Sequence, residues 1–128
     1  MQKLILALVV GCGGFIGAAS RYLISIFAAK NLGGNFPYGT LMANILGALL
    51  IGFIMEFSMD SALISSNMRL FLTTGIMGGL TTFSTFSYET ISMLNNGHIV
   101  LGIENAMLNL GCSLIFVVLG QKVARLLF

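Results

Sequence analysis

The chain has 128 residues, of which 57% are hydrophobic and only 8% are charged. Ordinary soluble domains carry roughly 25% charged residues, so this composition excludes a soluble globular protein, and the mean hydropathy of +1.00 indicates an integral membrane protein. A net charge of +2 is too small and too dispersed to indicate a nucleic-acid partner.

Four long spans of low charge predict four transmembrane helices, at about residues 4–29, 38–56, 70–94 and 99–121. Crossing a hydrocarbon core of about 30 Å takes roughly 20 helical residues, and each span is close to that length. Together the spans use up the chain. We therefore expect one all-α membrane domain over residues 1–128, with any function located inside the membrane.

The basic residues next to these spans show only a modest bias between the two membrane faces. We expect Arg21 and Lys30 to lie towards one face. The other face, which holds both termini, should carry Lys3, Arg69, Lys122 and Arg125. Positive residues decide the orientation of a membrane protein. A chain with a weak bias can insert both ways round, which permits an antiparallel dimer.

The first two spans each carry a polar side chain for which two roles are open. Arg21 is the only basic residue well inside a span; it either reaches out to the lipid headgroups or attracts anions at the mouth of a vestibule. In the second span, Thr40, Asn44 and Gly47 form a stripe at helical spacing. Asn44 either bonds a neighbouring helix, the commoner role of such an amide, or lines a polar route.

The third span is the most informative part of the chain. Between Leu70 and Tyr88 there is no charged residue, yet the middle holds Gly78 and Gly79, followed by hydroxyl side chains and two phenylalanines. Each glycine lowers helix propensity by about 1 kcal/mol, and threonines compete for backbone hydrogen bonds, so we predict a break near residues 78–82. The alternative is an intact helix with a hydroxyl-rich packing face.

A break at this depth would release backbone groups that can bind ions. Such groups are tolerated inside a membrane only when they are buried in protein or line a cavity. Freed carbonyl oxygens can coordinate a cation, and the N-terminus of a helix that resumes near Thr82 favours an anion. Phe83 and Phe86 share one face of that helix, and their ring edges carry the partial positive charge that suits a small anion. The interleaved Ser84 and Thr85 favour a pore face over a packed core.

The fourth span carries a stripe of polar side chains, in which Asn105, Asn109 and Ser113 follow one another at spacings of four. Three polar residues on one helical face predict the lining of a water path better than a single asparagine would. The sequence shows no paired carboxylates, no nucleophile with its base and no cluster of metal-ligating side chains. We therefore do not expect an enzyme.

The sequence from Gly78 to Ser87, GGLTTFSTFS, with Glu89 two residues further on, resembles the signature of the Fluc/CrcB family of fluoride channels. Arg21 fits the end of the family's first helix. Residues similar to the family's second-helix motif are Gly39, Thr40, Leu41, Asn44 and Gly47. The resemblance extends over essentially all 128 residues and includes the four-helix layout.

This resemblance implies a fluoride-selective passive channel in the plasma membrane (the bacterial inner membrane), which exports fluoride from the cytoplasm. It implies an antiparallel, dual-topology homodimer with two fluoride pathways, each lined by both subunits. A structural sodium ion (Na+) is expected at the dimer centre, held by the backbone carbonyls of Gly78 and Thr81. The resemblance places Phe83, Phe86, Asn44, Ser84 and Thr85 along the fluoride pathway. To these we add Asn109 and Ser113 from the polar stripe of the fourth span, and Arg21.

Two other functions are weighed against the channel. Small proton-coupled multidrug transporters are also four-helix dimers, but they need a membrane-embedded carboxylate in the first helix. Residues 4–20 contain none, and Glu89 lies late in the third span. A non-transporting membrane assembly subunit would explain the small residues, but it leaves the run of hydroxyls and phenylalanines without a purpose.

Overall fold

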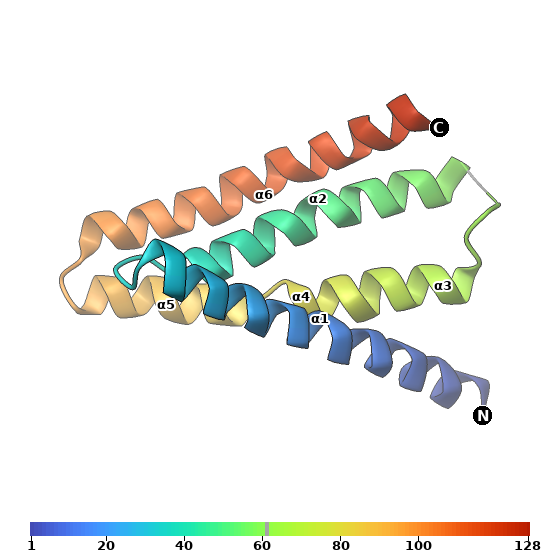
Figure 1. Cartoon of the computed structure of the whole chain (residues 1–128), viewed down its shortest axis with the longest axis horizontal. Helices are drawn as coiled ribbons and strands as arrows, with labels where there is room; N and C mark the ends of the chain where they lie inside the picture. Colours follow the sequence, from blue (N-terminus) through green and yellow to red (C-terminus); the bar gives the residue numbers. More distant parts are fainter. Residues whose placement is uncertain (61) are drawn as a thin grey trace.

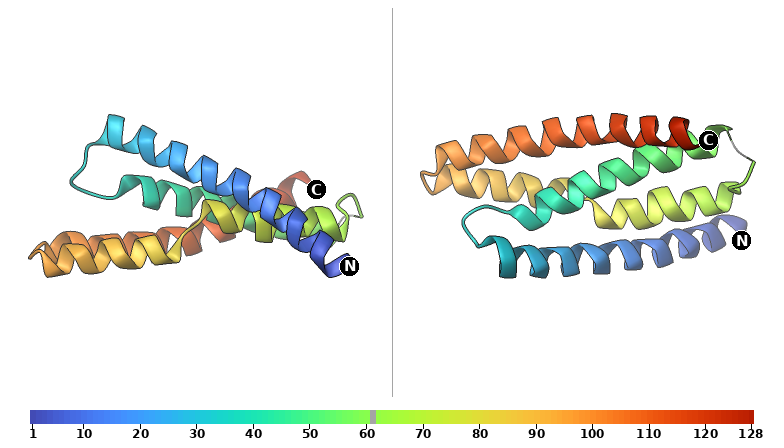
Figure 2. Two further views of the ribbon diagram at one scale, coloured as in Figure 1. Left: turned by 90° about the horizontal axis from the view of Figure 1, so that it is seen from below. Right: turned by 45° about the horizontal axis from the view of Figure 1, so that its top comes forward.

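The computed structural model describes residues 1–60 and 62–128, and every regular element in these residues is a helix. The elements are α1 (Gln2–Leu32), α2 (Tyr38–Asp60), α3 (Ser66–Leu70), the π-helix η1 (Phe71–Met77), α4 (Gly78–Leu80), α5 (Phe83–Asn95) and α6 (Ile99–Leu127). They form an elongated bundle with both termini at one end (Figures 1 and 2). The predicted all-helical fold is confirmed.

In the part of the chain that the structure describes, three helices are long and apolar enough, by length and composition, to cross a membrane: α1, the Tyr38–Met59 part of α2, and α6. Large apolar side chains also cover their outer faces, for example Leu8 and Phe15 on α1 and Met107 on α6, which are all exposed. A helix that is apolar on its outside as well as its inside needs lipid around it. The chain is therefore a membrane protein. The third predicted span is divided among α3, η1, α4 and α5.

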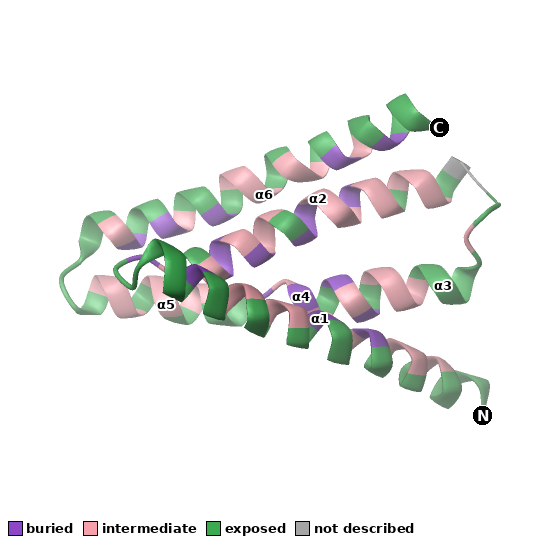
Figure 3. Ribbon diagram, viewed as in Figure 1, coloured by how far each residue is buried: buried purple, intermediate pink, exposed green. Residues whose placement is uncertain are grey.

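The interior of the bundle lies along two contacts, that of α2 with α6 and that of α1 with the segment from η1 to α4. Figure 3 places buried residues along both. The buried residues of α6 fall on one helical stripe that faces α2 and α5: Gly102, Asn105, Asn109, Gly120 and Ala124. Towards the termini, an ion pair between Glu56 and Arg125 joins α2 to α6.

Glycines allow α1 to lie directly against the broken third span. A Cβ atom on Gly17 would collide with the carbonyl oxygen of Ile76 and lie 2.7 Å from the backbone nitrogen of Leu80. A Cβ atom on Gly75 would lie 2.9 Å from the carbonyl oxygen of Val10. Backbone atoms cannot turn aside as flexible side chains do, so a larger residue at either position would push the helices apart. Small residues let helices in lipid approach in this way, and here they hold the break in place.

Candidate functional site

The third predicted span is interrupted at Thr81 and Thr82, which confirms the prediction of a broken helix. Both residues have extended backbones, with φ −84° and ψ 157° at Thr81 and φ −150° and ψ 120° at Thr82. The uncoiled stretch is visible between α4 and α5 in Figure 1. Thr82 then caps α5, because its Oγ1 accepts a hydrogen bond from the backbone N–H of Thr85 at 3.2 Å.

The glycine pair does not itself break the helix, which corrects part of the prediction. Gly78 has helical backbone angles, φ −61° and ψ −37°, and Gly79 lies within α4. Gly79 serves packing instead, since a Cβ atom there would collide with the carbonyl oxygen of Gly14 on α1. The helix stops at the two threonines that follow, where side-chain hydrogen bonds replace helical ones.

Asn44 of α2 takes over the hydrogen bonding of the interrupted backbone. Its Oδ1 accepts the backbone N–H of Thr82 at 2.8 Å, and its Nδ2 donates to the Thr82 carbonyl oxygen at 3.2 Å. Nδ2 also donates to Oδ1 of Asn109 on α6 at 2.8 Å. A buried backbone group without a partner is costly. One amide therefore stabilises the extended stretch and ties it to two neighbouring helices.

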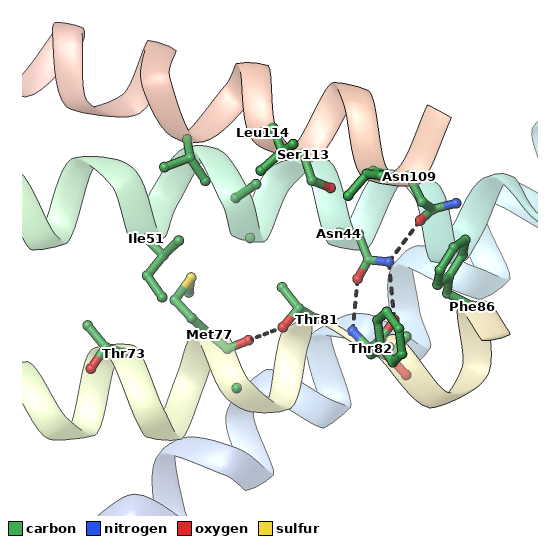
Figure 4. A pocket seen from close by; sticks show the side chains of 16 residues that line it. Asn44, Ile51, Thr73, Met77, Thr81, Thr82, Phe86, Asn109, Ser113 and Leu114 are labelled. Atoms are coloured by element: carbon green, nitrogen blue, oxygen red, sulfur yellow. Dashed lines mark hydrogen bonds between the residues drawn. The ribbon is translucent and has the colours of Figure 1, made fainter. Parts of the chain in front are cut away.

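A cavity of about 410 Å³ lies beside the break, between α2, α6 and the segment from η1 to α5. Figure 4 shows Asn44, Asn109 and Phe86 at one end of it and Thr73 and Ile51 towards the other. None of the described residues that line the cavity is charged. The residues of the predicted ion sites that it brings together are Asn44, Gly78, Thr81, Phe83, Phe86, Asn109 and Ser113.

Phe83 and Phe86 stand side by side on the first turn of α5. Their ring centroids are 5.6 Å apart and the ring planes are tilted by 60°. Phe86 is half-buried, whereas Phe83 is 80% exposed in the single chain. A tilted pair presents ring edges as well as faces to its surroundings, and the edges carry the partial positive charge.

Three residues of the predicted fluoride pathway do not line this cavity. Ser84 and Thr85 are exposed on the turn that carries the two phenylalanines. Arg21 is half-buried on α1, a helix that contributes no residue to the cavity wall. The cavity of a single chain thus contains part of the predicted pathway, and the hydroxyls of Ser84 and Thr85 lie on an outer face beside it.

The carbonyl oxygens of Gly78 and Thr81 lose their helical partners at the break. In an uninterrupted helix they would accept the N–H groups of Thr82 and Thr85, four residues further on. Here the Thr82 N–H donates to Asn44 and the Thr85 N–H donates to the Thr82 hydroxyl. Two carbonyl oxygens are thereby released on one short segment. Their chemistry fits a cation such as sodium, for which unwound backbone carbonyls serve as ligands in membrane proteins.

Two residues support the site without lining the cavity of the single chain: Asn105, which the sequence analysis places on the polar stripe of the fourth span, and Thr90. Asn105 is completely buried, and its Nδ2 donates to Oγ1 of Thr90 on α5 at 2.9 Å. Its Oδ1 accepts from Nδ2 of Asn109 at 2.9 Å. The four-residue spacing of Asn105, Asn109 and Ser113 indicates the importance of Asn105, but Thr90 is one of many hydroxyls and has no distinguishing sequence signal.

Taken together, these features define a class of protein: a multi-pass membrane protein in which a broken helix and its neighbours line an open, uncharged cavity. Residues 8–121 match the family model described as CrcB-like protein, Camphor Resistance (CrcB). The chain belongs to this family, so the resemblance found in the sequence is confirmed.

Three curated relatives agree with this assignment, and each has the name fluoride-specific ion channel FluC. The chain is 86% identical to the protein from Clostridium perfringens and 61% identical to that from Clostridium novyi, over the full length of both chains in each case. It is 46% identical to the protein from Ruminiclostridium cellulolyticum, over 98% of this chain and 96% of the relative. These relatives are thus named as ion channels and not as enzymes.

Proposed function

We propose that this chain is a fluoride-specific ion channel of the plasma membrane, through which fluoride leaves the cytoplasm passively. The observation that carries the proposal is the uncharged cavity at the break, which combines two phenylalanine rings with hydroxyl and amide groups. The names of relatives that match the whole chain support it. HF crosses bilayers uncharged and dissociates in a near-neutral cytoplasm, which traps fluoride. Because the cell interior is negative, the membrane potential drives the anion out and no pump is needed.

The cavity suits fluoride because it offers several weak contacts instead of one strong one. Conduction requires binding that is favourable enough for entry and weak enough for release, whereas a lysine or arginine would hold a small anion too firmly. The ring edges of Phe83 and Phe86 and the hydroxyl of Ser113 supply partial positive charge. The N-terminus of α5 at Thr82 adds a dipole of the sign that favours anions.

Efflux from liposomes tests this function against the two others. Purified protein should release trapped fluoride, but not chloride, without a proton gradient, and protein-free liposomes serve as the control. Proton-driven loss of an organic cation would instead support a small multidrug transporter. No flux in either assay would favour an assembly subunit. Any outcome other than selective fluoride release therefore contradicts the proposal.

We infer that the working unit is an antiparallel homodimer with two pathways, each lined by both subunits. Support comes from the outer face of the first turn of α5, where Phe83, Ser84 and Thr85 are exposed in the single chain. Hydroxyl groups that face hydrocarbon without partners are costly, and a second copy would cover them. A two-fold dimer brings the same patch of both subunits together, so it would complete the open side of both cavities at once.

Dual topology predicts that a single cysteine is accessible from both sides of the membrane. The test uses a chain in which Cys12 and Cys112 are replaced by alanine. Into it, Asn96→Cys introduces a single cysteine in the exposed turn between α5 and α6. A membrane-impermeant maleimide should label about half of the molecules in sealed vesicles, because a weak charge bias lets the chain insert both ways round. The remainder should react after permeabilisation. Ser66→Cys, near the opposite end of the bundle, should behave in the same way; labelling of either variant from one side alone would contradict dual topology.

We also propose a structural sodium ion at the dimer centre, held by the carbonyl oxygens of Gly78 and Thr81 from both subunits. Support comes from the hydrogen bonds at the break, which divert the N–H groups of Thr82 and Thr85 to side-chain oxygens. Two released carbonyls in each chain would give four ligands in the pair. A bound cation would neutralise the partial negative charges of these carbonyls and link the two subunits.

A further inference from the structure

We propose that Asn105 is a positioning residue of the channel: from within a chain of hydrogen bonds, it helps to hold the Asn109 amide, and through it the Asn44 amide, in the orientation found at the break. This inference rests on the proposed function only for its effect on fluoride flux. The hydrogen-bond arrangement that carries it belongs to the folded protein, whatever the protein transports.

Five hydrogen bonds run in one direction from α5 through α2 and α6 and back to α5. In order, they are Thr82 N–H to Asn44 Oδ1 (2.8 Å), Asn44 Nδ2 to Asn109 Oδ1 (2.8 Å), Asn109 Nδ2 to Asn105 Oδ1 (2.9 Å), Asn105 Nδ2 to Thr90 Oγ1 (2.9 Å) and Thr90 Oγ1 to the Phe86 carbonyl oxygen (2.8 Å). Both ends are backbone groups, one at the N-cap and one in the first turn of α5. This is the turn that carries the two rings.

The two backbone ends fix the donor and acceptor roles of every side chain between them. The Thr82 N–H can only donate, and the Phe86 carbonyl oxygen can only accept. Because Thr90 donates its hydroxyl proton to Phe86, its oxygen is left to accept from Asn105. Asn105 must then turn its Oδ1 towards Asn109. An amide can otherwise be placed either way round, and Asn105, at 0% exposure, has no bulk water as a substitute partner.

This arrangement uses the amide hydrogens that face the cavity. Nδ2 of Asn44 donates to the Thr82 carbonyl oxygen and to Asn109. Nδ2 of Asn109 donates to the carbonyl oxygen of Asn105 at 3.0 Å and to its Oδ1. Each Nδ2 has two hydrogens and makes two hydrogen bonds within the protein. The asparagines thus hold the cavity wall in place. A donor left for a passing anion is the hydroxyl of Ser113, which bonds no other residue in the described part of the chain.

Amide hydrogen exchange at Thr82 tests the chain directly. Asn105→Leu preserves the approximate size of the side chain and removes both of its side-chain hydrogen bonds, while the backbone carbonyl oxygen of residue 105 can still accept from Asn109. The Asn109 amide should then be held less firmly, because it retains only the backbone carbonyl oxygen of residue 105 and Asn44 as partners. Exchange of the Thr82 N–H should therefore accelerate about tenfold, while amides in the middle of α2 keep their protection. Fluoride efflux should fall by a similar factor. Asn95→Leu, at the exposed end of α5, controls for the substitution itself.

Thr90 supplies the second arm of the test. Thr90→Val removes the acceptor used by Asn105 and should reproduce the faster Thr82 exchange, whereas Thr90→Ser retains the hydroxyl and should restore wild-type exchange and flux. The effects of substitutions within one chain of hydrogen bonds are non-additive. The double variant Asn105→Leu with Thr90→Val should therefore show no faster Thr82 exchange than either single variant. Additive losses, or unchanged Thr82 exchange in Asn105→Leu and Thr90→Val, would overturn the proposal. If the wild-type protein passed no fluoride, the proposed function would fail, and the exchange data would still decide the role of Asn105.

Discussion

Replacing Phe86 with isoleucine should lower the rate of fluoride efflux from liposomes about tenfold or more, which corresponds to roughly 1.4 kcal/mol in the barrier. Isoleucine keeps an apolar side chain in the wall of the cavity, but it lacks the positive ring edge that an anion can approach. The hydrogen bond from Thr90 to residue 86 ends on the backbone carbonyl and survives the substitution. The protein should therefore stay folded while conduction fails, as measured by efflux alongside size-exclusion chromatography.

Phe83→Ile should have a similar effect, because the two rings stand 5.6 Å apart and line the same cavity. Phe27→Ile provides a matched control, since Phe27 is an exposed phenylalanine on α1 and does not line the cavity. Unchanged efflux in both cavity variants would contradict the proposed role of the rings. Loss of efflux accompanied by aggregation would show that the rings act in packing and not in conduction.

The existence of the break could be predicted from the sequence because its causes are partly local. Glycines and threonines in the middle of an apolar span weaken the helix wherever it packs. The position of the break depends on partners distant in sequence. Asn44, which bonds the extended backbone of Thr82, is 38 positions away in the chain. Gly79 stays helical against the backbone of α1, and no local signal separates it from a glycine that ends a helix.

The residues that line the cavity could likewise be predicted only where the cause is local in sequence. Helical spacing correctly groups Asn109 with Ser113 and Phe83 with Phe86, since residues three or four apart share a face. Spacing cannot show that Asn44 and Asn109, 65 positions apart, bond each other, because that depends on how α2 packs along α6. It also cannot show that Ser84 and Thr85 lie outside the cavity of a single chain. Such placement is set by tertiary packing, and for these two hydroxyls we propose that a second subunit decides it.

Removing sodium should destabilise the protein, because the proposed ion holds together carbonyl groups whose usual helical N–H partners bond side-chain oxygens instead. A ligand that binds only the folded state stabilises it by about 2.7 kcal/mol at 100 times its Kd. The melting temperature should therefore rise with sodium concentration, and replacing sodium by caesium at constant ionic strength should lower both the melting temperature and the dimer fraction. Equal stability in the two salts would contradict the site.

The chemistry of the site also predicts which substitution sodium binding should tolerate. Thr81→Val keeps the backbone carbonyl and a methyl group in the position where Thr81 Cγ2 packs against Gly47. It removes only the hydroxyl, which donates to the carbonyl oxygen of Met77 at 3.0 Å. If the ligand is the carbonyl, the sodium dependence of the melting temperature should persist in this variant. If the dependence disappears while the protein stays folded, the hydroxyl is the ligand, and the break does not supply carbonyls to a cation at Thr81.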